Sequence, residues 1–594
     1  MHQKKKRESI MSLLKSSYIR SFFKKYWISY LLGLFFLVSI DYGQTILPLI
    51  IGDVIDGLGF KTITMDNIGV QIWKILLIAV IICLGRVAWR YFIFGTSRKI
   101  ERDIRNDMFS HLEKLSPRYY SEHKTGEIMA YVTNDLEAVR NSMGQGIMML
   151  FDVIAMGFFT VYKMITEVNV SLTLFAALPL LLISLTSVVL GPKMFKRFSD
   201  RQAAFAHVSD FVQENISGIK VIKAFKQEKK ELEAFDEINK DYFDKNMVLM
   251  KLHAGMRPIM TFISGLSMAI AIGYGGYLAI YGIISPGKFT AFINYLSMLV
   301  WPMMAVGMVI NMVTQGSAAL KRVETVLAEP VEINDEGTDP SITSYEGSIE
   351  FNHLNYKYPD GENNVLNDIT FKIEKGQTLG IVARTGSGKT TLINLLLRLY
   401  NVDRGSIYLG GHDIMDIPLK VLRENIGYVT QENFLFSDSI RNNIDLSNGN
   451  LGMDVIKEAA EFACVHDNIV EFKDGYDTVV GERGVTLSGG QKQRVSMARA
   501  LIKDPEILIL DDSVSAVDTN TEEQILEHLE KERKNKTNII IAHRISTLQN
   551  ADKIIVIDDG RIIEEGTHEE LVKNDKLYNS LYQKQLLEKD IEEA

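Results

Sequence analysis

Long apolar segments, confined to the first half of the sequence, constrain this chain more than any other feature. The hydrocarbon core of a bilayer is about 30 Å thick, so a helix needs about 20 apolar residues to cross it. Six segments of the 594-residue chain meet that length: 27–51, 72–94, 143–165, 171–190, 258–284 and 289–312. The last three contain no Asp, Glu, Lys or Arg. The sequence therefore predicts an α-helical membrane domain of six spans.

Basic residues ahead of the first span predict its orientation. The run from Lys4 to Arg7 and the later Lys24 and Lys25 place the N-terminus in the cytoplasm. Six crossings then return the second half of the chain to the same side. The inward connections, 95–142 and 191–257, are long and charged with helical periodicity, which predicts helices that project beyond the membrane. Their far ends are predicted at the glycine-containing turns 116–126 and 214–218.

Several charged, Met and Phe side chains inside the spans or at their ends allow two interpretations. Asp41, Arg86 and Lys163 can line a polar pathway, because charge in lipid is costly, or they can pair with one another or lie beyond the true span ends. For Arg86 and Arg90 pairing or a shifted boundary is favoured, and for Asp41 both interpretations stay open. A set of Met and Phe residues is predicted to be packing, with a flexible binding surface as the alternative: Met256, Met260, Phe262, Met303, Met304 and Met308.

The two halves of the chain differ in charge. Residues 1–330 carry 37 basic and 27 acidic side chains, a net of +10, whereas 331–594 carry 28 and 47, a net of −19. The only cysteines, Cys83 and Cys464, lie in opposite halves, so disulfide stapling and a multi-cysteine metal site are not expected. Overall acidity disfavours a nucleic-acid partner. The predicted division is a basic N-terminal segment 1–26, a membrane domain 27–328, a linker 329–346, a soluble domain 347–585 and a tail 586–594.

The soluble domain contains a strand, a glycine-rich loop and a helix in succession. The apolar run 378–382 precedes Ala383, Arg384, Thr385, Gly386, Ser387, Gly388, Lys389, Thr390 and Thr391. Backbone amides around the two glycines can point at phosphate, the lysine can reach the outer phosphates, and the Thr390 hydroxyl can bind Mg²⁺. Ala383 replaces the first glycine of the usual pattern, a mild departure if its φ is negative.

A second element completes a nucleotide site. The continuous apolar run 507–510 is typical of a buried parallel strand and ends in Asp511 and Asp512. A carboxylate at the end of such a strand, beside the phosphate loop, can hold the Mg²⁺ that bridges the outer phosphates. Together the two elements predict an α/β P-loop ATPase domain fused to the six-span membrane domain.

Further motifs make the chain resemble a half-size ATP-binding-cassette (ABC) exporter of the bacterial multidrug type. The signature motif is matched by Leu487, Ser488, Gly489, Gly490 and Gln491, and the other motifs of the family by Tyr358 (adenine stacking), Gln431 (Q-loop), 481–484 (X-loop), 515–518 with Asp518 (D-loop) and His543 (switch histidine). They occur in the family's order, and with the six spans the resemblance covers nearly the whole chain.

The resemblance implies how these residues act. Two chains would dimerise, with each ATP and its Mg²⁺ held between one chain's phosphate loop and the other's signature motif. Thr390, Gln431 and Asp511 would bind Mg²⁺, and Asp512, Gln431 and His543 would serve catalysis. The turns of the inner projections would be coupling helices, represented here by Tyr119, Tyr120, Gly126, Glu214, Asn215 and Gly218. ATP binding would drive alternation between inward-facing and outward-facing states.

One residue departs from the family in an informative way. The family usually has Glu as the general base directly after the Walker B aspartate, where this chain has Asp512. Its side chain is one methylene shorter, and a misplacement of about 1 Å can cost about 10²-fold in rate. We therefore expect a slow site that binds ATP, in a heterodimer whose partner carries the catalytic Glu and uses this chain's intact signature motif. The alternative is a homodimer in which Asp512 is the working base.

The cargo is less constrained than the machinery. An ATP-driven pump for amphipathic drugs is the first hypothesis. A lipid flippase or peptide exporter is the second, and a non-transporting regulatory subunit is the third. The C-terminal tail is predicted to be a solvated helix end.

Overall fold

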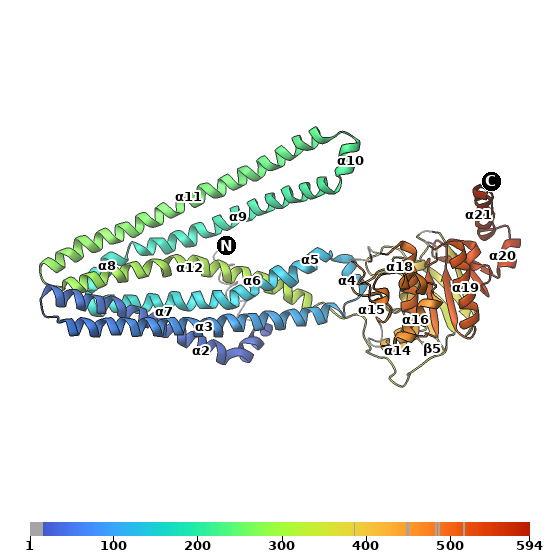
Figure 1. Ribbon diagram of the computed structural model, residues 1–594, viewed down its shortest axis with the longest axis horizontal. Coiled ribbons are helices and arrows are strands. Elements are labelled where there is room, and N and C mark those ends of the chain that lie inside the picture. Colours follow the sequence, from blue (N-terminus) through green and yellow to red (C-terminus); the bar gives the residue numbers. More distant parts are fainter. Residues whose placement is uncertain are drawn as a thin grey trace. The chain divides into compact units, whose positions relative to one another are not determined.

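The computed structural model describes residues 16–384, 386–446, 451–481, 484, 487–514 and 517–593. The chain divides into two compact units, a helical unit of residues up to 329 and an α/β unit of 330–594 that also includes the short segment 114–122 (Figure 1). Each unit is described by itself below.

The helical unit is built from very long helices. Among the described residues, six stretches are long and apolar enough to cross a membrane: Ser17–Gly59, Met65–Leu112, Thr125–Val168, Val170–Ser217, Glu228–Ile280 and Pro286–Leu327. The regular helices in them are α2 (Ser17–Gly59), α3 (Met65–Leu112), α5 (Thr125–Ala130), α6 (Leu136–Asn141), α7 (Ile147–Lys163), α8 (Val170–Ala177), α9 (Leu180–Ser217), α11 (Glu228–Ile280) and α12 (Pro286–Leu327). The prediction of six spans is confirmed.

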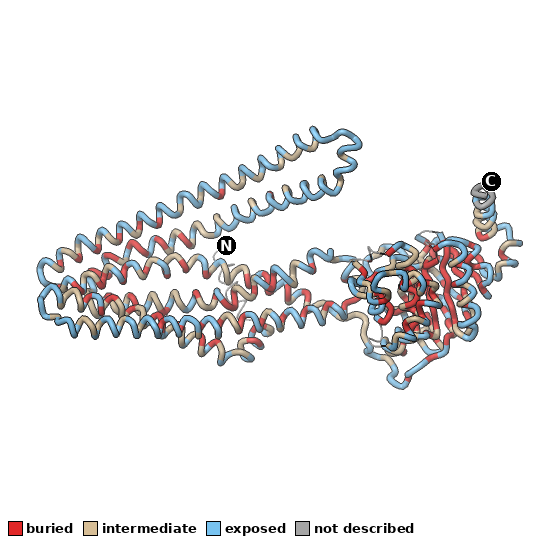
Figure 2. The backbone as a smooth tube through the Cα atoms, in the orientation of Figure 1, coloured by how far each residue is buried: buried red, intermediate tan, exposed pale blue. Residues whose placement is uncertain are grey.

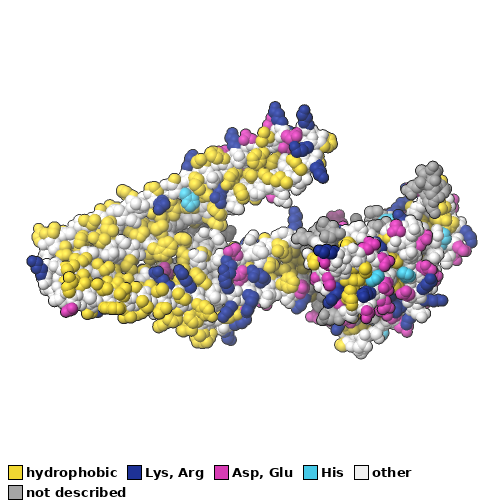
Figure 3. All heavy atoms as spheres, in the orientation of Figure 1, with side chains coloured by type: hydrophobic (Ala, Val, Ile, Leu, Met, Phe, Trp, Pro, Cys, Tyr) yellow, Lys and Arg dark blue, Asp and Glu magenta, His cyan; other side chains and the backbone are white. Residues whose placement is uncertain are grey.

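Apolar side chains cover much of the outside of this unit, as expected of a surface that faces lipid (Figure 3). Trp73 is 73 % exposed, Leu84 66 % and Phe158 64 %. Most helices run well beyond the predicted apolar segments, because polar residues with helical periodicity continue each span. The first helix begins at Ser17, capped by the Ser16 side chain, rather than near residue 27.

The inner projections end in two different ways. The first ends in the short helix α4 (Pro117–Glu122), which carries Tyr119 and Tyr120, and Gly126 lies in the first turn of α5. The predicted position of the second turn is wrong by a few residues. Glu214 and Asn215 still belong to the last turn of α9, since nothing in them stops a helix, and Gly218 ends it. The connection itself is α10 (Ile219–Ala224), which buries no residue within this chain.

The α/β unit contains two sheets. The first is antiparallel, in the order β2-β1-β4-β5, from β1 (Ile349–Tyr356), β2 (Leu366–Ile373), β4 (Ile407–Leu409) and β5 (His412–Asp413). The second has the order β10-β9-β3-β8-β7-β6, from β3 (Thr378–Ala383), β6 (Ile426–Val429), β7 (Ile507–Asp511), β8 (Thr537–Ile541), β9 (Lys553–Asp558) and β10 (Arg561–Gly566). Only β10 runs antiparallel to its neighbour in this sheet.

Helices cover the second sheet on both sides, so its central strands are buried throughout (Figure 2). The helices of this unit are α13 (Lys389–Leu396), α14 (Leu419–Glu424), α15 (Ile440–Ile444), α16 (Met453–Phe462), α17 (His466–Val470), α18 (Gly489–Leu501), α19 (Thr519–Glu532), α20 (His568–Lys573) and α21 (Leu577–Glu593). Because β3, β8, β7 and β6 are parallel neighbours, the loops after their carboxyl ends lie along one edge. The phosphate loop, His543, Asp511 and Gln431 follow those four strands in that order. The predicted fold class is therefore confirmed.

Candidate functional site

The phosphate loop joins β3 to α13. Gly386 has a φ of 84° and Gly388 a φ of 95°, left-handed conformations that glycine adopts without strain. A Cβ at Gly388 would lie 2.6 Å from Leu366 Cδ2, so this position also lacks space for a side chain. Ala383 ends β3 buried and with a negative φ, so its methyl group is tolerated. Ser387 is buried and Thr390 and Arg384 are exposed, whereas Thr385 lies outside the described residues.

Lys389 begins α13 and faces the ends of two other strands. Its Nζ lies 3.3 Å from His543 Nε2, in the loop after β8. Burial lowers the pKa of Lys389, while the carboxylates of Asp511 and Asp512 act in the opposite direction. The lysine, the predicted switch histidine and the two aspartates therefore form one cluster, although the lysine is more than 120 residues from the other three in sequence.

Asp511 is the buried carboxylate of this cluster. It ends β7, is 5 % exposed and accepts a hydrogen bond from the Tyr428 hydroxyl on the neighbouring strand β6. Burial raises the pKa of Asp511, and Lys389 and the Tyr428 hydroxyl oppose that rise. A carboxylate oriented by a second hydrogen-bonding group is typical of a metal ligand.

Asp512 adopts an unusual backbone conformation directly after β7. Its φ is 48°, a left-handed value that Asp tolerates better than most residues. Its backbone N–H donates to the Ile541 carbonyl at 2.8 Å, and its carbonyl accepts from Gln493 Nε2 at 3.3 Å. These bonds fix the backbone at the position of the expected general base, so the reach of the carboxylate depends on side-chain length.

Tyr358 lies at the rim of the phosphate loop. Its ring packs edge-on against Tyr356 and Tyr400, and its hydroxyl is 3.0 Å from Thr391 Oγ1 in α13. The structure thus brings the predicted adenine-stacking residue to the predicted phosphate loop. Gln431 is exposed two residues after β6.

The signature residues form the start of α18. Ser488 caps this helix in a capping box with Gln491, and Ser488 and Gly489 are exposed while Leu487 is buried. The N-terminal amides of α18 are therefore presented at the surface, where they can face an anion. Asp518 caps α19 and accepts hydrogen bonds from the Thr521 backbone and hydroxyl, which lower the pKa of Asp518. Residues 482–483 of the X-loop and 515–516 of the D-loop lie outside the described residues.

The segment that carries α4 contacts the linker inside the α/β unit. Ser116 Oγ donates to Glu332 at 2.9 Å, and Arg118 pairs with the same carboxylate at 2.7 Å. Arg118 also lies 3.5 Å from Asp360, two residues beyond Tyr358. The first predicted coupling segment is thereby tied to the neighbourhood of the adenine-stacking residue.

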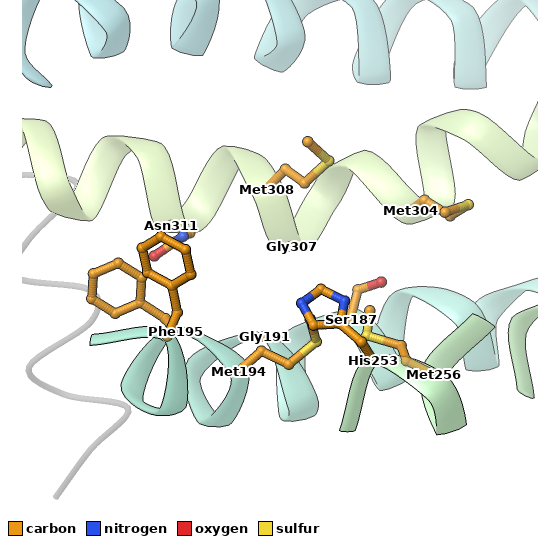
Figure 4. A pocket seen from close by; sticks show the side chains of 11 residues that line it. Ser187, Gly191, Met194, Phe195, His253, Met256, Met304, Gly307, Met308 and Asn311 are labelled. Carbon is orange, nitrogen blue, oxygen red and sulfur yellow. The ribbon is translucent and has the colours of Figure 1, made fainter. Parts of the chain in front are cut away.

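The helical unit contains two adjoining cavities, one between α9, α11 and α12 (Figure 4) and one between α6, α9 and α12. Their volumes are about 260 Å³ and about 490 Å³, and both are lined by Ser187, Gly191, Phe195, Gly307 and Asn311. The first adds Met194, Met256, Met304 and Met308 with His253. Three of the methionines named from sequence thus line a cavity, whereas Met260 is core and Phe262 is 72 % exposed. None of the described residues lining either cavity carries a carboxylate.

Sequence reasoning missed two contributors to the ATPase cluster. Tyr428 on β6 contacts Asp511 on the neighbouring strand β7, and Gln493 on α18 contacts Asp512. No local spacing pattern predicts such tertiary contacts. A polar residue within a buried strand is the weak signal that could have identified Tyr428.

The fold and this cluster define a membrane-bound P-loop ATPase, in which one chain carries both the spans and the nucleotide domain. Comparison with known proteins gives the family. The profile of the ABC transporter transmembrane region matches residues 30–303, and the ABC transporter profile matches 366–515. The chain belongs to the ABC transporter family, as a half-size exporter, and is an ATP hydrolase coupled to transmembrane export.

Curated relatives of multidrug type match nearly the whole chain. "Probable multidrug resistance ABC transporter ATP-binding/permease protein YheI" of Bacillus subtilis is 37 % identical over 95 % of this chain and 97 % of its own length. "Multidrug resistance-like ATP-binding protein MdlA" of Escherichia coli is 37 % identical over 96 % and 97 %. A solved structure of a bacterial Atm1-family ABC exporter with ATP bound has a TM-score of 0.74 and 24 % identity, covering 96 % of this chain and 99 % of that one. This last likeness supports the fold.

Proposed function

We propose that this chain is the slow-site subunit of a heterodimeric exporter for amphipathic compounds, with both termini in the cytoplasm. The observation that carries the proposal is the combination of Asp512 with a well-formed signature helix in one chain. Each ATP in such a dimer lies between one chain's phosphate loop and the other chain's signature motif. The short base therefore weakens this chain's own site, while Ser488 and the start of α18 serve the partner's site.

The residues around the phosphate loop fit ATP with Mg²⁺. Asp511, Thr390 and Gln431 offer carboxylate, hydroxyl and amide oxygens, the donor atoms that Mg²⁺ prefers. Bound Mg²⁺ would neutralise charge on the outer phosphates. Lys389 would hold those phosphates, the backbone amides at Gly386 and Gly388 would orient them, and His543 would lie beside them through its contact with Lys389.

The cavities of the helical unit support an amphipathic cargo. Thioether and aromatic side chains adapt to many apolar shapes, and Asn311, Thr314 and Gln315 add hydrogen-bonding groups. The cation at one end, Arg322, is already paired with Asp135 at 2.7 Å. The lining thus matches compounds with a large apolar part and a few polar groups, and the multidrug names of the relatives agree with that chemistry.

The test is ATPase activity of this chain alone and co-expressed with a candidate companion half-transporter. In the pair, Asp512→Ala should change turnover little, whereas removing the companion's Walker B carboxylate should abolish it. A chain that is a fast ATPase by itself, and that Asp512→Ala inactivates, would instead be a homodimer with Asp512 as its base.

A further inference from the structure

Asp41 is a buried carboxylate that the ATP-driven cycle does not explain. It lies in the middle of α2, within a predicted span, and is 1 % exposed. Its Oδ2 atom is buried and has no hydrogen-bond donor. An ionised carboxylate left without a donor in an apolar span is strongly unfavourable, so this position requires a specific compensation.

A second carboxylate interacts with Asp41. The side chain of Asp152, on α7, lies within hydrogen-bonding reach of Asp41. Ionised carboxylates only accept hydrogen bonds, so two of them can bond to each other only when one carries a proton. Asp152 also accepts a hydrogen bond from the Trp301 indole on α12. The indole supplies its own proton to that bond, whereas the contact between the two aspartates has a proton only if one of them is protonated.

The charges around the pair require one further positive charge. From α3, Arg86 is the cation that acts on both aspartates, and α12 contributes the uncharged Trp301. Two carboxylates and one guanidinium sum to a single negative charge. One proton makes the group neutral, which is the state favoured in an apolar span.

The helices on either side of Asp41 are in close contact. Beside Asp41, a Cβ at Gly85 of α3 would come within 2.9 Å of the Ile40 side chain, so α2 and α3 are in close contact there. One residue further on, the rings of Tyr42 and Phe159 pack at 5.4 Å between α2 and α7. Asp152 is half-buried and Trp301 is 52 % exposed, so Asp152 is the more accessible member of the pair.

We infer that Asp41 and Asp152 form a one-proton binding site inside the membrane domain, shared between α2 and α7. The two carboxyl groups share the proton while α2 and α7 are packed together. When the helices separate, the proton leaves from the side of Asp152. A conformational change that moves α2 against α7 would therefore take up or release one proton. This inference stands independently of the cargo and of the slow ATP site.

The full-length protein in detergent can be tested with dicyclohexylcarbodiimide, an apolar reagent that modifies protonated carboxyl groups. Mass spectrometry should find one adduct, on Asp41 or Asp152, and its yield should fall as the buffer is made alkaline. Asp41→Asn and Asp152→Asn should each abolish it, because the remaining carboxylate then has an amide donor and Arg86. Asp53→Asn, an exposed position on the same helix, is the matched control and should keep it.

Infrared spectroscopy gives a readout that does not depend on access of the reagent. The wild-type protein at neutral pH should show the C=O band of a protonated carboxyl group. In Asp41→Asn the intensity of that band should fall by the amount expected for one carboxyl group. Labelling that is equal in wild type and Asp41→Asn, or a spectrum in which the two are the same, would overturn the proposal. Exclusion of the labelling by an organic ammonium compound would reassign the site to a cationic cargo.

Discussion

At the scale of single residues, the length of the Asp512 side chain should limit the turnover of its site. Its backbone is fixed by the bonds to Ile541 and Gln493, so Asp512→Glu moves the carboxylate outward by about one methylene. We expect ATP hydrolysis at this site to rise, by up to about 10²-fold. Glu is less favourable than Asp at a φ of 48°, at a cost of at most about 1–2 kcal/mol.

The measurement is ATPase activity in a complex whose companion site has been silenced, so that the remaining turnover reports on Asp512. Asp512→Asn is the control, because it has the same size as Asp512 and cannot act as a base. An unchanged rate for Asp512→Glu would mean that reach is not what slows this site.

Tyr428 should tune the affinity for Mg²⁺ through Asp511. Its hydroxyl donates to the buried carboxylate and opposes the rise in pKa that burial causes. Loss of a group that orients a metal ligand typically costs about 10–100-fold in metal affinity, and Tyr428→Phe should weaken Mg²⁺ by that order. The pKa of Asp511 rises further in the variant, and Mg²⁺ binds the ionised form, so binding should be lost at a higher pH on acidification.

Titrations of Mg²⁺ in the presence of ATP, repeated over a range of pH, would measure both effects. Tyr400→Phe is a suitable control, because Tyr400 packs on Tyr358 and has no contact with Asp511 among the described interactions. If Tyr428→Phe and wild type lost Mg²⁺ at the same pH on acidification, the hydroxyl would not influence Asp511.

At the scale of elements, the start of α18 combines a structural cap with a functional surface, and the two can be separated. Ser488→Ala removes a capping box, which should destabilise the nucleotide domain by about 1 kcal/mol. It should also strongly reduce turnover at the partner's site, because Ser488 is exposed at the end of the helix that faces that nucleotide in the proposed dimer. Thr567→Ala removes an equivalent capping box from α20, away from the signature motif.

Thermal unfolding and ATPase activity of the two variants distinguish the roles. Both should lower the melting temperature by a similar amount, and Thr567→Ala should keep its activity. If the two variants lost activity in parallel, Ser488 would matter only as a cap.

The elements also show which features local sequence can predict. The apolar strand, the glycine loop and Lys389 follow one another directly in the sequence, so local sequence alone predicts the phosphate loop. The same holds for the apolar strand that ends at Asp511. The predicted position of the second inner turn is wrong because Glu214 and Asn215 are compatible with helix, so only Gly218 marks the end of α9. The pairing of Asp41 with Asp152, and of Tyr428 with Asp511, joins residues on different elements. A single sequence contains no record of such tertiary contacts.

At the scale of the whole molecule, the proposed function requires that the cavity between α9, α11 and α12 binds the cargo whose movement ATP drives. Phe195 lines both cavities, so Phe195→Ala removes apolar contact area from the cargo while leaving the nucleotide domain unaltered. Burying an aromatic side chain contributes about 1.5–3 kcal/mol, which corresponds to a loss of about tenfold or more in apparent affinity. Phe262→Ala is the matched control, because Phe262 is 72 % exposed on α11 and lines neither cavity.

Cargo-stimulated ATPase activity of the proposed heterodimer in lipid nanodiscs would measure the effect, with an amphipathic dye as the probe. The half-maximal dye concentration should rise about tenfold in Phe195→Ala and stay the same in Phe262→Ala. Transport of the dye into inverted vesicles should shift in parallel, because the same cavity is filled before each ATP-driven transition. A shift in stimulation without one in transport would mean that the dye regulates the ATPase from this cavity without being carried, which would favour the regulatory alternative over the exporter of amphipathic compounds.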